Sequence, residues 1–151
     1  MAGRSTRSLD VMKGAVLFIA AITSAASASH AAEFDAVEVS EALVRHVARY
    51  SYPNQAPEVI CLSASVPEHV QLLVERLRGA APLIQTSSEC RLSSSSQSKR
   101  LWVNLGVPVK EAEGVFLQSI DYGSSSHCVF RARRDGSGQW NISINTPCVV
   151  S

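Results

Sequence analysis

The chain lacks a long apolar run and a strong net charge. Its longest uninterrupted apolar run is Ala15–Ile22, whereas a helix needs roughly 20 apolar residues to cross a bilayer. We therefore expect no membrane anchor in the mature chain. The formal net charge is +1 at pH 7. Such a balance gives no general attraction to nucleic acid or to anionic membranes, and we expect neither as a partner.

The chain also lacks the short motifs that carry chemistry. Its four cysteines are too widely spaced for a C-x-x-C zinc site. A Gly-x-Ser-x-Gly nucleophile motif and a glycine-rich phosphate loop are both missing from the sequence. We therefore expect no metal and no cofactor. The sequence does not decide whether the protein is an enzyme, but these absences favour a non-catalytic role.

The N-terminal segment has the layout of a secretory signal peptide. Basic residues come first, the apolar run follows, and small residues extend to Ala32. The basic residues are Arg4, Arg7 and Lys13. This order predicts export to a bacterial periplasm or secretion from the cell.

The signal is expected to cover residues 1–31 and to be removed. Small residues permit cleavage after Ala28 or after Ala31, and the sequence does not choose between them. Met12 followed by Lys13 would already begin a complete signal, so we expect Met12 to be the true start. Cleavage after Ala28 leaves 11 of the 14 basic and 12 of the 13 acidic residues, a net charge near −1. Residues 32–151 are then one small globular domain.

All four cysteines lie in the mature part, at positions 61, 90, 128 and 148. Export and an even number of cysteines together predict two structural disulfides, because an oxidising compartment lets them persist. Three pairings are possible. We favour Cys61 with Cys90 and Cys128 with Cys148, and the other two pairings stay open.

The last two predicted strands, residues 128–134 and 139–146, form a hairpin around the loop Gly136–Gly138. A three-residue loop with Gly138 in the left-handed conformation sets Ala132 opposite Ile142. In the same register Phe130 faces Ile144 and Arg134 faces Trp140.

This register places Cys148 diagonally across from Cys128. Diagonal neighbours lie about 7–8 Å apart, slightly too far for a disulfide. The favoured pairing therefore requires the last strand to break register near Pro147.

Two helices are predicted in the first half of the mature chain. Residues 33–50 carry apolar side chains at helical spacing, and Glu41, Arg45 and Arg49 form a charged stripe that we expect to be a solvated face. The second helix covers residues 66–77 and ends before Gly79. Ser65 and Glu68 have the form of a capping box, with Pro67 in the first turn.

The other segments read as strands. Residues 59–63 are a short β-prone run, and residues 82–92 include a strand that ends near Cys90. Strict alternation predicts a strand over residues 101–109, and residues 115–122 form the next one. The class is α+β, with two N-terminal helices packed on a C-terminal antiparallel meander of about four to five strands. By fold analogy alone it is compatible with the curved, cone-like sheets of nuclear-transport-factor-like or cystatin-like domains.

The candidate binding residues lie on the polar side of the last hairpin. Arg131, Arg133 and Asn141 should share one face of the sheet with Ser143 and Asn145. Guanidinium groups there could hold an anion or a partner's carboxylates.

Trp102 is a further candidate for binding. It lies on the less apolar face of its strand, so it is either covered by a helix or exposed as a binding anchor.

Two functions from different classes are compatible with these features. The favoured one is a small exported, non-catalytic binding or inhibitor-type domain whose partner is an unknown protein or a small anionic ligand. The alternative is a small secreted or periplasmic hydrolase whose site assembles only in three dimensions, with His127 or His69 as the base. That alternative requires a carboxylate or serine within about 3 Å of the histidine.

Overall fold

The computed structural model describes residues 33–50, 57–79, 82–93, 99–123 and 126–150. The predictions for the signal peptide and for the start at Met12 concern residues outside these ranges. By its contacts the chain divides into residues 1–35 and residues 36–151, and every strand of the structure belongs to the second unit.

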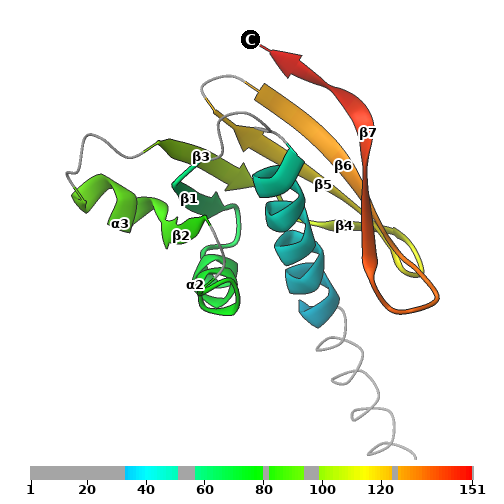
Figure 1. Cartoon of the computed structure of the whole chain (residues 1–151). Helices are drawn as coiled ribbons and strands as arrows, with labels where there is room; N and C mark the ends of the chain where they lie inside the picture. The colour runs from blue at the N-terminus through cyan, green and yellow to red at the C-terminus, as the bar shows by residue number, and fades with distance from the viewer. Residues whose placement is uncertain (1–32, 51–56, 80–81, 94–98, 124–125, 151) are drawn as a thin grey trace, which may run out of the picture. The chain divides into compact units, whose positions relative to one another are not determined.

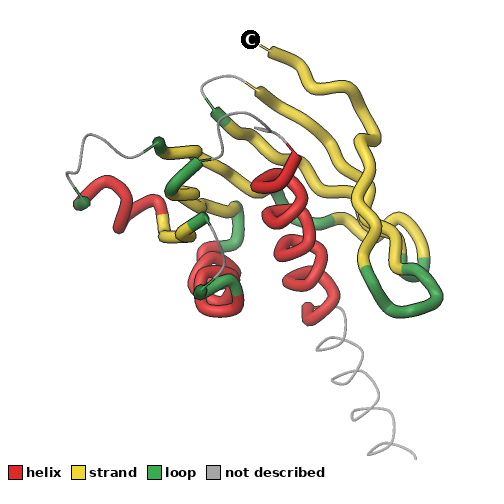
Figure 2. The backbone as a smooth tube through the Cα atoms, in the orientation of Figure 1, coloured by secondary structure: helices red, strands yellow, loops and turns green. Residues whose placement is uncertain are grey.

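Helices alternate with strands in the first half of this unit, and strands follow one another in the second half (Figures 1 and 2). The elements are a helix over residues 33–50, β1 Val59–Ala64, α2 Pro67–Arg76, β2 Leu83–Thr86, α3 Ser87–Leu92, β3 Arg100–Leu105, β4 Val109–Ala112, β5 Val115–Tyr122, β6 Ser126–Arg134 and β7 Trp140–Val150.

The strands form one open seven-stranded sheet in the order β2-β1-β3-β5-β6-β7, with β4 paired to β5. Pairing is antiparallel from β3 onward, but β1 runs parallel to both β2 and β3. The class is α+β, as expected. The sheet is antiparallel from β3 onward, but as a whole it is mixed and has seven strands instead of the predicted four to five. The reason is that helices intervene between β1, β2 and β3, and a helical crossover is the connection that parallel neighbours need.

The helix over residues 36–50 and α2 cover one face of the sheet. Leu43, Val47 and Leu73 are fully buried there against alternate residues of the strands, such as Ile60 and Leu62. Cys61 lies between those two strand residues and therefore points to the opposite face. It is bonded to Cys90 of α3, so α3 packs against that second face. The structure thus has three helices in its described part, one more than predicted.

A buried polar contact fixes the first helix against the sheet. The Gln118 side chain donates to Ser40 Oγ at 2.9 Å and to the Gly106 carbonyl at 2.9 Å. Gln118 and Ser40 are both 2% exposed. A Cβ at Gly106 would lie only 2.0 Å from Ser119 Oγ, so any larger residue here would require the Ser119 hydroxyl to move.

The predicted capping box at Ser65 is wrong. The cap of α2 is Val66, without a side-chain hydrogen bond, although Pro67 does begin the helix. Ser65 instead donates its backbone N–H to Leu105 at 2.8 Å, which continues the pairing of β1 with β3. A capping box forms at Thr86 and Glu89, where it begins α3.

Two strand boundaries also differ from prediction. The strand expected to end near Cys90 stops at Thr86, because the capping box starts a helix there. The strand predicted over residues 101–109 ends at Leu105, and Val109 begins the separate strand β4. Pro108, which has no backbone donor, lies in the gap between them.

The hairpin register is confirmed. Ala132 pairs with Ile142, and Phe130 with Ile144. Arg134 pairs with Trp140, and Gly138 has φ +83°.

Beyond Phe130 the register shifts twice, so that His127 pairs with Val149. The shift brings Cys148 opposite Cys128, with a Cα–Cα distance of 4.3 Å, and the two form a disulfide. The expected break near Pro147 is therefore present. Both favoured cysteine pairs are formed.

Candidate functional site

The predicted arginine face is present and exposed. Arg131 pairs with Ser143 and Arg133 with Asn141 across the strands, and these four side chains and that of Asn145 are exposed. Arg131 Nη2 donates to Glu111 at 3.0 Å, and the Asn141 side chain donates to Asp135 at 3.0 Å. Two of the predicted binding groups are therefore engaged with neighbours on the same surface.

Trp102 does not join this surface. It is 38% exposed, and Arg91 lies over its ring at 6.0 Å. The Trp102 carbonyl accepts from Gly123, just past the end of β5. Arg131 instead pairs with Leu117, six residues earlier in the chain and within β5. Six residues along a strand correspond to roughly 20 Å, so Trp102 and the arginines do not act on one small ligand.

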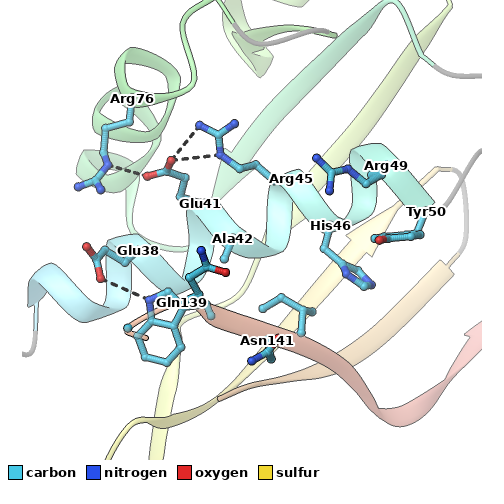
Figure 3. Close-up of a pocket in the computed structure, with 13 residues that line it drawn as sticks. Glu38, Glu41, Ala42, Arg45, His46, Arg49, Tyr50, Arg76, Gln139 and Asn141 are labelled. Carbon is cyan, nitrogen blue, oxygen red and sulfur yellow. Dashed lines mark hydrogen bonds and ion pairs between the residues drawn. The ribbon is translucent and has the colours of Figure 1, made fainter. Parts of the chain in front are cut away.

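The concave feature of the structure lies elsewhere, between the first helix, α2 and the β6–β7 hairpin (Figure 3). It is an open groove of about 790 Å³. Its lining residues are Glu38, Glu41, Ala42, Arg45, His46, Arg49, Tyr50, Arg76, Gly138, Gln139, Trp140, Asn141 and Ile142. Asn141 is the one predicted binding residue among them.

The helix contributes its polar side to this groove. The lining positions 38, 41, 42, 45, 46 and 49 recur at intervals of three and four, so they share one side of the helix. Ala42 in this row is small and leaves the wall open. The stripe expected to be a simple solvated face therefore forms part of the concave surface.

One carboxylate serves two arginines on the α2 side of the groove. Glu41 accepts from Arg45 Nη2 at 3.0 Å and from Arg76 Nε at 2.7 Å. Arg49 lies one turn beyond Arg45 and has no ion-pair partner among the described residues. Figure 3 shows Arg45 and Arg49 on the exposed side of the helix. This side of the groove therefore carries more cationic than anionic groups.

The hairpin end of the groove is fixed by Glu38. Arg134 Nη2 donates to Glu38 at 2.8 Å, and the Trp140 indole N–H donates to the same carboxylate at 3.3 Å. The Arg134 guanidinium also lies 5.2 Å from the Trp140 ring centroid. The hairpin is thus held to the first turns of the helix by charge, hydrogen bonding and aromatic contact.

His46 forms the wall between the arginines and β7. Its ring lies 4.8 Å from that of Tyr50 and meets Phe130 edge-on at 5.7 Å. Burial lowers the pKa of His46 below its ordinary value of 6.5, because a buried site disfavours the charged imidazole. Burial therefore favours the neutral form of the imidazole at this wall.

A hydrogen-bonded polar row crosses the other face of the sheet. Ser63 donates to Asn104 Oδ1 at 3.1 Å, and Asn104 Nδ2 donates to Asp121 at 3.4 Å. His127 Nδ1 lies 2.5 Å from Asp121 Oδ1, so the sequence-predicted requirement for a carboxylate beside this histidine is met. Both side chains are more than half exposed, and the groove does not include them.

The three histidines among the described residues do not converge. His46 lies on the first helix, His69 on α2 and His127 on β6. Within the described residues the side chain of His69 has no hydrogen-bonded carboxylate or serine. Of the two histidines predicted as a base, His127 is the one with a carboxylate beside it among the described residues.

Neither a metal-ligating cluster nor a membrane-spanning helix is found in the described ranges. They contain no group of three or more His, Cys, Asp and Glu side chains able to hold a metal ion. They also contain no helix of the length and apolarity needed to span a bilayer. Comparison with protein-family models, with curated proteins and with solved structures gave no match to this chain.

Proposed function

We propose that the mature chain is an exported, non-catalytic domain that binds an anionic ligand, or an acidic part of a partner protein, in the groove. The observation that carries the proposal is the charge of the groove. Three guanidinium groups, those of Arg45, Arg49 and Arg76, line the groove together with two carboxylates, those of Glu38 and Glu41. Guanidinium groups with unused donors bind carboxylates and phosphates through charge-assisted hydrogen bonds.

The groove supports this function better than the arginine face does. Ligand sites are usually concave, because concavity removes more of the ligand from water. Arg131 and Arg133 lie on an exposed sheet surface, where an ion pair contributes little. The groove also has a neutral wall, His46, beside its cations.

Two structural disulfides suggest an oxidising, exported environment. Together with the signal-peptide sequence, they support a periplasmic or secreted location for the proposed function.

The test uses Arg49→Glu, with Arg133→Glu as the matched control on the opposite face. Citrate and a short polyglutamate peptide are titrated into the isotope-labelled mature protein and followed by NMR. We expect shifts around His46 and Arg49 in the wild type. Arg49→Glu should weaken binding by about tenfold or more, since one charge-assisted hydrogen bond contributes about 1.5–3 kcal/mol. The control should bind as the wild type does.

Loss of binding in Arg133→Glu, with Arg49→Glu unaffected, would move the site to the arginine face. The contact of His127 with Asp121 supports the hydrolase as a second candidate, because the carboxylate binds Nδ1 and so orients the ring. Against it, the hydroxyl of Ser63 is directed at Asn104 and not at the imidazole. Turnover of ester or peptide substrates that is abolished by His127→Ala would replace the binding function by this one.

A further inference from the structure

We propose that the partner presents an extended acidic segment that pairs with the free edge of β7 as an added strand. The inference rests on the proposed function and names the form in which the anionic partner binds. β7 is the last strand in the sheet order and pairs with β6 alone among the described strands. Extended segments bind such edges through main-chain hydrogen bonds.

The register shows which groups of β7 are available. The backbone N–H of Arg134 donates to Gly114 on the β5 side. The N–H and C=O groups of successive residues point to opposite sides of a strand, so those of Arg133 point toward β7. Those of its partner Asn141 point toward β6. The N–H and C=O groups of Trp140, Ile142 and Ile144 therefore point outward, at the free edge.

The same three residues face the groove and the helix. Trp140 and Ile142 line the groove. Ile144 is 58% exposed although its cross-strand partner Phe130 is only 4% exposed. Ile144 thus lies on the face of the sheet that the helices pack against, but at the edge no other element buries it. A strand added beside β7 would bury it.

The helix runs alongside β7 in the same direction. Glu38 contacts Trp140 near the hairpin, and His46 contacts Phe130, which is paired with Ile144. Arg45 and Arg49 are four residues apart, which is about 6 Å along a helix. Alternate residues of a strand are spaced by about 6.6–6.8 Å. Acidic side chains two residues apart in the added strand therefore match the spacing of these two arginines.

Charge favours an acidic segment over a second copy of this chain. Three arginines and two glutamates line the groove beside the edge. Two such edges brought together would place like charges side by side, which is unfavourable. An acidic strand would be attracted by the same groups.

The test measures binding of a short fluorescein-labelled peptide in which glutamate and valine alternate. Two further peptides carry N-methyl groups on either the odd or the even residues. The protein is the full mature chain with both disulfides, as wild type, Ile144→Pro, Ile144→Ala and Arg49→Glu. Proline at 144 removes an outward N–H without breaking a bond to β6, and such positions tolerate proline. The alanine variant loses the same side chain and keeps that N–H.

We expect the parent peptide to bind and Ile144→Pro to bind it about tenfold more weakly than Ile144→Ala does. One methylated peptide should lose binding while the other keeps it, because only alternate residues of an added strand face β7. If both methylated peptides bind like the parent, or if the two variants at 144 are equal, strand addition is wrong. Citrate binding sensitive to Arg49→Glu would then still support the anionic groove.

Two other results would contradict the anionic groove or the acidic partner as well as strand addition. If Arg49→Glu binds every anion as the wild type does, the proposed function fails together with this inference. If sedimentation shows a dimer that Ile144→Pro dissociates and Arg49→Glu does not, the edge is occupied by a second copy and not by an acidic segment.

Discussion

Glu41 and His46 set the chemical character of the groove at the scale of single residues. Glu41 shares its carboxylate between Arg45 and Arg76. His46 contacts Tyr50 and Phe130, and burial favours its neutral form. The surface therefore carries charge on one side and a neutral, partly aromatic wall on the other.

The lowered pKa of His46 predicts a pH dependence of stability. Its pKa in the unfolded chain is near 6.5 and is lower in the native protein. Between these two values the unfolded chain binds more protons, so stability falls as pH falls through that window. Chemical denaturation at pH 7.5 and pH 5 should show a smaller loss in His46→Gln than in the wild type. Equal losses in the two proteins would contradict the burial of this ring.

At the scale of elements, the N-terminal caps of α2 and α3 differ although their sequences have the same pattern. Thr86 Oγ1 accepts from the Glu89 N–H at 3.2 Å, and Glu89 accepts from the Thr86 N–H at 2.8 Å. At Ser65, where the sequence has the same pattern, no such bond forms. The difference lies in the backbone N–H of the capping residue: that of Thr86 is donated to Glu89, whereas that of Ser65 is donated to Leu105 of β3.

This difference gives a paired test of the two sites. Thr86→Ala should lower the free energy of unfolding by about 1 kcal/mol, the usual contribution of an N-cap side chain. Ser65→Ala should change it by less than about 0.5 kcal/mol, as exposed substitutions do. Urea denaturation of both variants measures the contrast. An equal loss at Ser65 would mean that the predicted capping box does form there.

Local patterns were sufficient for the hairpin and insufficient for the first half of the sheet. The turn residues and the apolar match fixed Ala132 opposite Ile142, and the cysteine geometry predicted the break near Pro147. The parallel pairing of β1 with β3 joins segments about 40 residues apart, and no local signal in either segment encodes that partner.

The groove was missed for the same reason. Arg45 was assigned to a solvated stripe, correctly placed on the polar side of its helix. The other walls of the groove come from distant parts of the chain. Arg76 is 35 residues from its partner Glu41, and Trp140 is 102 residues from Glu38. Only the tertiary fold brings these three elements together.

At the scale of the whole molecule, each disulfide stabilises a different half of the sheet. Cys61–Cys90 holds α3 to β1, and Cys128–Cys148 joins β6 to β7. They close segments of 29 and 20 residues. Since the two pairs do not overlap in sequence, their effects on the unfolded chain should be largely independent.

Replacing both members of one pair by alanine tests this division. The chain-entropy model gives about 3 kcal/mol for a loop of this size. We expect Cys128→Ala with Cys148→Ala to lose about that amount in the free energy of unfolding, measured by urea denaturation. Peptide binding at β7 should weaken as well. The matched double variant at Cys61 and Cys90 should lose similar stability with less effect on that binding.

The register shift near Pro147 has a mechanical consequence. Strands of a hairpin normally separate like a zipper when one end is pulled. Here the C-terminal end of β7 is bonded to β6 through Cys148, so a pull from that end loads a covalent bond before it reaches residues 140–144. A partner attached along the edge could therefore bear tension without peeling the last strand from the sheet.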